Sequence, residues 1–518
     1  MKTAVLIAMM LQGFLTGSST TERAAGKTKA QPTITDQKAR PRVDKEKQTQ
    51  PDPKLVALVN DARSAPPEFG ADTLLRVVES GKLTDQAWKR ELVSAAFQLA
   101  TQAKQPVKRA SISGALVDSR SGYLSRAFRL GLDGLSLKCR AVKAMVSIDK
   151  RKAREMFQEI PQPKLEPLTC EESLVYDVAD FYDTLRIIAQ NTFAAKTMRL
   201  DEYTRFIKSH IEAMNSPIQV GPIAKLILAL RLSPPQLETL VHTFSLALAQ
   251  ISGDDRSFAQ ATTSTSIIPE MVRLITLCKQ QDLARDELIE AFRDYLTKNL
   301  NADRCIINNA EGEQSLSRPS YIDYFNTNLR FANLPSRKEI LPITTEEIKP
   351  ASIRGMAKIY PYWQSPKSKS LLLRFKNLRF ASGDRRFNAK EQSEQEWQWQ
   401  LSQFLNDMVN WHTEDEDSEA DYFHQKSVLF HALIEDLPSG DLRRKVLNDY
   451  VAFLSNSRIQ QDNPIEWFLQ AHYLVDRVRT SQASERSEIL EVLNHSHSAA
   501  LYLYAESERV LASIRQTQ

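Results

Sequence analysis

Residues 83–104 read LTDQAWKRELVSAAFQLATQAK, and this stretch shows the pattern that decides the fold class. Its apolar side chains recur at steps of three and four residues, the spacing that places side chains on one face of an α-helix. Members of this face include Trp88, Leu92 and Leu99. Thr84 and Asp85 precede the face and are typical of an N-cap, where a side-chain oxygen accepts a bond from a free backbone N–H. The stretch predicts an amphipathic helix.

The same helical period continues along most of the chain from residue 54. Between the expected helices, the connections are short and carry Pro, Asn, Asp or Ser, and such connections imply antiparallel neighbours. The sequence therefore predicts an all-α protein of stacked helical hairpins that resembles an irregular α-solenoid in outline. Beyond the first stretch, helices are expected at residues 133–148, 149–160, 170–195, 200–214, 222–232, 234–251, 269–281, 282–300, 394–411, 419–436, 441–455, 464–480, 485–493 and 498–514.

One region interrupts this rhythm. Residues 301–364 carry seven prolines and glycines that favour loops, and only one short helix is expected within them, at 320–330. We therefore expect an N-terminal helical-hairpin array at 54–300, an irregular connecting region at 301–364 and a C-terminal helical domain at 365–518.

The N-terminus has the layout of a secretory signal peptide. Lys2 is followed by an apolar run from Ala4 to Leu15 and then by small residues up to Ser19. The run is shorter than the roughly 20 residues that cross a bilayer, and a buried first helix is the alternative. Residues 20–53 are polar and basic, which predicts a disordered basic linker. The sequence thus predicts a signal peptide at 1–19 and a secreted or periplasmic protein without a transmembrane segment in the mature chain.

Composition and charge exclude several functions. The chain of 518 residues carries a net charge of +4, but residues 1–54 alone carry +5 and the remainder −1. A nearly neutral body has no overall electrostatic reason to bind nucleic acid. The chain has only 15 glycines and lacks the Walker A, GxGxxG, GxSxG and HExxH motifs. No catalytic residue and no cofactor is therefore predicted.

A charge switch near residue 390 is the sharpest compositional feature. Residues 364–390 carry a net charge of +7 and residues 391–421 a net −10, with aromatic residues on both sides of the boundary. One interpretation is a binding surface for a glycan or a polyanion. The alternative is that two adjacent helices pair their charges and pack their aromatic rings. The candidate binding residues are Tyr360, Tyr362, Trp363, Lys367, Lys369, Arg374, Lys376, Arg379, Trp397 and Trp399.

A candidate metal site follows the acidic run. Asp421, His424, His431 and Glu435 fall on one broad face of an expected helix, and nitrogen and carboxylate ligands suit a metal ion. The two histidines, however, are separated by about 10.5 Å along the helix axis. Histidines bonded between neighbouring helices are the alternative.

Four cysteines allow disulfides if the chain is exported. The pairing of neighbours in sequence, Cys139 with Cys170 and Cys278 with Cys305, closes two loops of similar size and is favoured among three connectivities. Four buried free thiols are the alternative.

Two functions remain after these exclusions. The first is a non-enzymatic extracytoplasmic scaffold that binds a protein partner along a helical surface, as helical arrays do. The second is an extracytoplasmic α-helical enzyme that acts on a glycan or cell-wall polymer, with residues 360–411 as an aromatic platform and Asp421, His424 and Glu435 as acid/base groups. Neither the partner nor the oligomeric state follows from the sequence.

Overall fold

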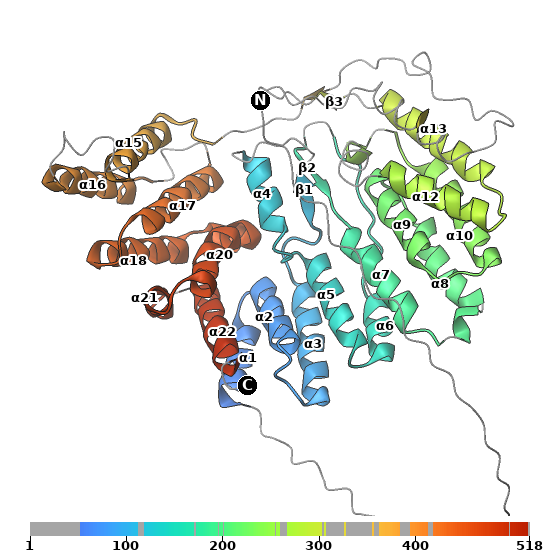
Figure 1. Cartoon of the computed structure of the whole chain (residues 1–518), viewed down its shortest axis with the longest axis horizontal. Coiled ribbons are helices and arrows are strands. Elements are labelled where there is room, and N and C mark those ends of the chain that lie inside the picture. The colour runs from blue at the N-terminus through green and yellow to red at the C-terminus, as the bar shows by residue number, and fades with distance from the viewer. Residues whose placement is uncertain are drawn as a thin grey trace, which may run out of the picture. The chain divides into compact units, whose positions relative to one another are not determined.

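The computed structural model describes residues 52–111, 119–169, 172–194, 196–199, 201–253, 255–258, 267–302, 305–306, 326–327, 355–356, 362–383, 394–412, 418–496 and 498–515. Within these ranges it contains twenty α-helices (Figure 1). Strands are limited to two pairs there: β1 (Arg109–Ser111) lies antiparallel to β2 (Leu174–Tyr176), and β3 (Cys305–Ile306) lies parallel to β4 (Gly355–Met356). The predicted all-α class is confirmed.

The helices of the N-terminal part lie next to one another in a regular order. α2, α3, α5, α7, α9 and α12 each contact the next helix in this series, and α10 contacts α8, α9 and α13 (Figure 1). A 3-10 helix, η1 (Thr197–Arg199), precedes α8. The bounds are α1 Pro53–Ser64, α2 Pro67–Glu79, α3 Gln86–Thr101, α4 Arg120–Phe128, α5 Gly134–Val146, α6 Lys150–Gln158, α7 Ala179–Asn191, α8 Asp201–Glu212, α9 Pro217–Ala229, α10 Pro234–Gln250, α12 Ile267–Gln280 and α13 Asp286–Ala302.

The C-terminal part is also built from contacting helices. α15 contacts α16 and α17, α17 contacts α18, and α20, α21 and α22 contact one another. Their bounds are α15 Pro366–Gly383, α16 Glu394–Val409, α17 Glu419–Asp436, α18 Asp441–Asn456, α19 Ile459–Asp462, α20 Pro464–Thr480, α21 Ala483–Asn494 and α22 Ala499–Arg515. None of the described helices combines the length and the apolarity needed to cross a membrane.

Local side-chain chemistry explains several helix starts. The Asp85 carboxylate accepts bonds from the backbone N–H groups of Ala87 and Trp88, at 2.7 and 3.2 Å, and so caps α3. α9 begins earlier than its expected start at residue 222, because the Gln219 side chain accepts a bond from the Ser216 N–H and closes a capping box. α9 therefore continues through Pro222.

One expected helix is shorter than its pattern. The sequence predicts helix from residue 170, but α7 begins at Ala179, and residues 174–176 instead pair with β1. A strand distant in sequence decides this difference. The backbone of Arg109–Ser111 forms hydrogen bonds with residues 174–176, and these replace the hydrogen bonds that the segment would form within a helix.

The first helices pack directly against the last ones. Phe69 of α2 contacts the rings of Trp467 and Phe468 in α20, with centroids 5.6 and 5.3 Å apart. α22 contacts both α1 and α2, and α20 contacts α4. The helices on the two sides of residues 301–364 therefore share one hydrophobic core.

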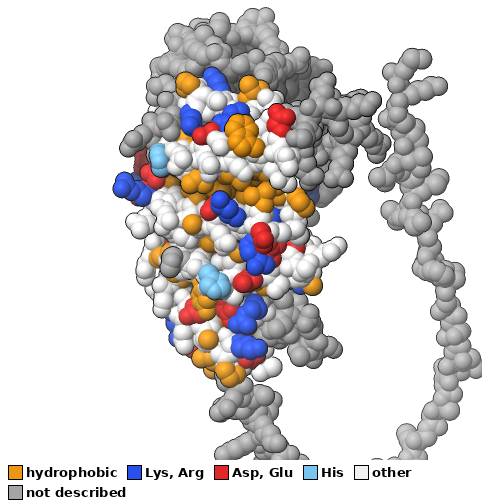
Figure 2. Space-filling view, turned by 90° about the vertical axis from the view of Figure 1, so that its left-hand side faces the viewer, with side chains coloured by type: hydrophobic (Ala, Val, Ile, Leu, Met, Phe, Trp, Pro, Cys, Tyr) orange, Lys and Arg blue, Asp and Glu red, His pale blue; other side chains and the backbone are white. Residues whose placement is uncertain are grey.

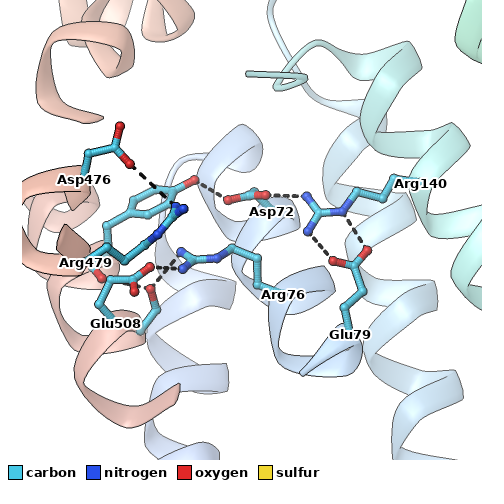
Figure 3. Close-up of polar contacts among 9 residues, drawn as sticks. Asp72, Arg76, Glu79, Arg140, Asp476, Arg479 and Glu508 are labelled. Carbon is cyan, nitrogen blue, oxygen red and sulfur yellow. Dashed lines mark hydrogen bonds and ion pairs between the residues drawn. The ribbon is translucent and has the colours of Figure 1, made fainter. Parts of the chain in front are cut away.

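A polar network accompanies this apolar contact (Figure 3). The Tyr504 hydroxyl of α22 donates to the Asp72 carboxylate of α2 at 2.6 Å, and Arg140 of α5 pairs with the same carboxylate. Arg76 of α2 pairs with Glu508 of α22. Because Asp72 and Tyr504 are buried, these bonds satisfy groups that would otherwise be costly inside the core.

The predicted disulfides are not found. Cys139 of α5 and Cys278 of α12 are free thiols, and both are buried in the helical core. Burial raises the pKa of Cys139 to about 12 and that of Cys278 to about 11, so both stay protonated. Cys170 lies outside the described residues, as does the side chain of Cys305.

Candidate functional site

The basic–aromatic segment predicted as a binding surface forms α15 and α16, which pack against each other. Arg374 of α15 pairs with Asp407 of α16, and its guanidinium lies over the Phe404 ring, 5.9 Å from the centroid. The indole N–H of Trp397 donates to the Leu378 carbonyl at 3.4 Å. Part of the charge switch and of its aromatic character therefore serves the packing of these two helices.

The aromatic residues before α15 are not on the surface. Tyr362 and Trp363 are exposed by only 4% and 9%, so they cannot form the ligand platform that the sequence indicated. They are buried because they pack onto the joined N- and C-terminal helices, where Tyr362 stacks on His424 with ring centroids 4.0 Å apart. Tyr360 and the side chain of Arg379 lie outside the described residues.

Other predicted binding residues do face solvent. Lys369 and Lys376 of α15 are exposed, and Lys367 is half-buried. With Leu373, which is 61% exposed, Lys369 and Lys376 lie at steps of four and three residues and share one face of α15. On α16, Trp399 is 63% exposed. We call these four exposed side chains of the packed helix pair, Lys369, Leu373, Lys376 and Trp399, the α15–α16 surface, without implying that Trp399 contacts the other three.

Figure 2 views the side of the molecule on which α15, α16 and α18 lie in Figure 1. Hydrophobic side chains appear there in a band across the middle and in patches near the top, among scattered charged groups. Large hydrophobic side chains that are exposed on these helices include Val409 of α16 and Leu442 of α18 in addition to Leu373 and Trp399.

The residues considered as metal ligands do not converge. On α17, His424 shares a hydrogen bond of 2.9 Å with the Gln470 amide, whereas His431 shares one of 2.7 Å with the Tyr450 hydroxyl. The His431 ring also stacks on Tyr473, with centroids 3.9 Å apart. In the described part of the chain, no group of three or more His, Cys, Asp or Glu side chains is placed to hold a metal ion. Both histidines connect α17 to neighbouring helices.

Burial also fixes the charge of these histidines. It lowers the pKa of His424 and of His431 to about 3, and Arg126 adds to the effect at His424 by repelling a positive charge. Both rings are therefore neutral at ordinary pH. A neutral imidazole has one donor and one acceptor nitrogen. His424 accepts from the Gln470 amide, whereas His431 donates to the Tyr450 hydroxyl, whose own hydrogen goes to the Gln470 carbonyl at 2.9 Å.

His424 belongs to a buried polar cluster where α4, α17 and α20 meet, which we call the junction cluster: Tyr123, Tyr362, His424, Glu466 and Gln470. The Tyr123 hydroxyl donates to the backbone carbonyl of Glu466 at 2.6 Å. Its ring also lies 4.3 Å from the His424 ring. The cluster thus connects one helix of the N-terminal part to two helices of the C-terminal part.

Glu466 is the unusual member of the junction cluster. Its side chain is almost fully buried, Asn463 donates to Oε2 at 3.0 Å, and no described residue donates a hydrogen bond to Oε1. Burial raises the pKa of this carboxyl to about 7; Arg120 opposes the rise and Asp421 adds to it. A carboxyl that exchanges a proton near neutral pH is suited to acid/base chemistry. With 1% of Glu466 exposed, however, the group is closed to a substrate.

Sequence reasoning identified His424 and Tyr362 but not Tyr123, Glu466 or Gln470. Tyr123 and Glu466 are 343 residues apart, and no local pattern connects them. The sequence NPIE at 463–466 indicates a helix start, which is where Glu466 lies, but it gives no sign of burial.

Comparison with known proteins gives no family for this chain. No family model matches it, and no curated protein and no solved structure matches it either. Its function must therefore be argued from its own side chains and their geometry.

Proposed function

We propose that the protein is an extracytoplasmic helical scaffold without catalytic activity, which binds a protein partner through the α15–α16 surface. The observation that carries this proposal is the 63% exposure of Trp399. Tryptophan offers a large contact area and is enriched at the centre of protein interfaces. α15, which packs against α16, presents an exposed leucine between two exposed lysines, Lys369 and Lys376, so that the helix pair offers both apolar and positively charged groups to a partner.

Two further observations support the scaffold. The side-by-side order of α2, α3, α5, α7, α9 and α12 is what stacked helical hairpins of a solenoid would give. The signal-like segment at residues 1–19 supports export. A glycan-active enzyme has less support, because its aromatic platform would need Tyr362 and Trp363, and its acid/base set would need His424, all of which are buried.

The test places a photo-reactive amino acid at position 399 of the full chain and, as a matched control, at position 246. Leu246 of α10 is also exposed, by 52%, but lies outside the α15–α16 surface. We expect a protein from the exported fraction of the producing cell to crosslink at 399 and not at 246. The purified partner should then bind Trp399→Ala about 30-fold more weakly than the wild type, the loss for a hot spot of about 2 kcal/mol.

Two outcomes would contradict the proposal. One is equal crosslinking at the two positions, which would show contact without a preferred surface. The other is a partner whose affinity is the same for Trp399→Ala and for the control Leu246→Ala.

A further inference from the structure

A groove of about 540 Å³ lies between α6 and α8, apart from the α15–α16 surface and the junction cluster. α6 contributes Arg151, Arg154 and Glu155, which share one helix face because they are three and four residues apart. α8 contributes Glu202, Arg205 and Phe206 at the same spacing. Both helices thus line the groove with arginine and glutamate side chains.

Two of the three arginines in the groove have no carboxylate partner in the part of the chain that the structure describes. Arg151 bonds Glu155 at 2.9 Å, so its charge is matched within α6. Arg154 and Arg205 form no ion pair with any described residue. An arginine presents a planar fork of N–H donors that fits carboxylate and phosphate oxygens in pairs. The groove therefore holds two guanidinium groups whose donors are available to an anion.

Aromatic rings line the groove beside these arginines. Phe193, which follows α7, and Phe206 of α8 lie with ring centroids 5.4 Å apart. The Arg154 guanidinium lies 4.9 Å from the Phe193 ring centroid, and this cation–π contact orients the side chain before any ligand arrives. Phe206 is half-buried, and Phe193 is only 7% exposed, so the groove presents mainly the Phe206 ring and an edge of Phe193 beside the two arginines. This lining is suited to a ligand with an anionic group and a flat apolar group.

We propose that this groove binds a small phosphate monoester whose ester group carries a flat apolar ring. Arg154 and Arg205 bind the phosphate oxygens, and Phe193 and Phe206 contact the ring. A dianion fits better than a single carboxylate because Arg154 and Arg205, which form no ion pair among the described residues, can each bind one of its charged oxygens. Glu202 also lines the groove and forms no ion pair with a described residue. Its negative charge repels the part of an anion that lies near it, and its oxygens can accept a bond from a donor group of the ligand.

The test is calorimetric titration of the full chain with phenyl phosphate, at a pH above its second pKa of about 6 so that the probe is a dianion. We expect saturable binding at one site, at least tenfold tighter than the binding of inorganic phosphate, and no binding of phenol. Arg205→Gln and Arg154→Gln should each weaken binding at least tenfold. The control is Arg129→Gln, since Arg129 follows α4, is exposed and lies outside the groove.

Each possible failure is informative. Absence of binding up to about 10 mM phenyl phosphate, a concentration that would detect even a millimolar Kd, would overturn the proposal. Equal affinities of the wild type and Arg205→Gln would also overturn it, and because Arg205 is exposed, this variant keeps the fold. Inorganic phosphate binding as tightly as phenyl phosphate would overturn the role given to the two phenylalanines.

Discussion

Replacing Glu466 by glutamine should change how the stability of the protein depends on pH. The folded protein holds this carboxyl with a pKa of about 7, raised by burial from its ordinary value of 4.5. Between these two values the folded protein keeps a proton that the unfolded chain has released. Raising the pH therefore favours the unfolded chain, and the free energy of unfolding falls across this window. Glutamine does not titrate, so the variant lacks this fall.

The size of the effect follows from the two pKa values. A rise from 4.5 to about 7 corresponds to about 3 kcal/mol, because one pH unit is worth about 1.4 kcal/mol. This contribution is fully present below pH 4.5 and lost above the folded pKa. The free energy of unfolding of Glu466→Gln, minus that of the wild type, should thus increase by about 3 kcal/mol between pH 4.5 and 8. The buried amide adds a cost that is independent of pH and cancels from this change.

The comparison between variant and wild type is essential because buried histidines act in the opposite direction. Burial lowers the pKa of His424 and His431 to about 3, below the ordinary 6.5. As the pH falls through this range, the unfolded chain takes up protons that the folded rings do not, so the histidines make stability increase with pH. Their slope is common to both proteins and disappears from the difference.

The assay is equilibrium unfolding in urea at several pH values, followed by tryptophan fluorescence. Trp467 is fully buried next to Glu466 and reports on this part of the core. The control is Glu238→Gln, because Glu238 of α10 is exposed and its replacement removes a carboxyl without touching the core. A difference between Glu466→Gln and the wild type that stays constant from pH 4.5 to 8 would refute the reasoning, since it would mean that the carboxyl is hydrated in the folded protein.

Three further predictions concern the helical core. Gly70→Ala should destabilise the protein by about 1–3 kcal/mol in urea unfolding, because a Cβ atom there would lie 2.3 Å from the Ala62 carbonyl oxygen and would force α1 and α2 apart. Tyr504→Phe should cost about 1–3 kcal/mol in the same assay, because it removes the buried bond of 2.6 Å to Asp72; an unchanged midpoint would contradict the network of Figure 3. Cys139 should resist alkylation in the folded protein at pH 8 and react in urea, as mass spectrometry of its peptide would show, because burial raises its pKa to about 12.

The helices could be predicted because their signals are local. Asp85 caps α3 as the sequence indicates, and Met156 and Phe157 of the expected 149–160 helix are buried in α6. The same local signal fails at residues 174–178, where Leu174 and Val178 fit a helical period but Leu174 belongs to β2. A strand partner 65 residues earlier decides the structure there, and the period of a single segment contains no information about it.

The burial of the candidate binding residues could not be predicted either, because it also depends on contacts with segments distant in sequence. Tyr362 lies in a basic and aromatic segment that is typical of an exposed binding surface. It is buried because the rings of His424 and Tyr123, from two helices distant in sequence, pack against it. The groove between α6 and α8 differs, since each half carries its signal in sequence: Arg151, Arg154 and Glu155 on one helix, and Glu202 and Arg205 on the other, lie at helical spacing. The sequence does not indicate that these two helix faces lie opposite each other in the folded protein. A charged helix face therefore becomes a candidate site when a second charged face packs opposite it. Guanidinium groups that remain without an ion pair then distinguish such a site from a solvated face.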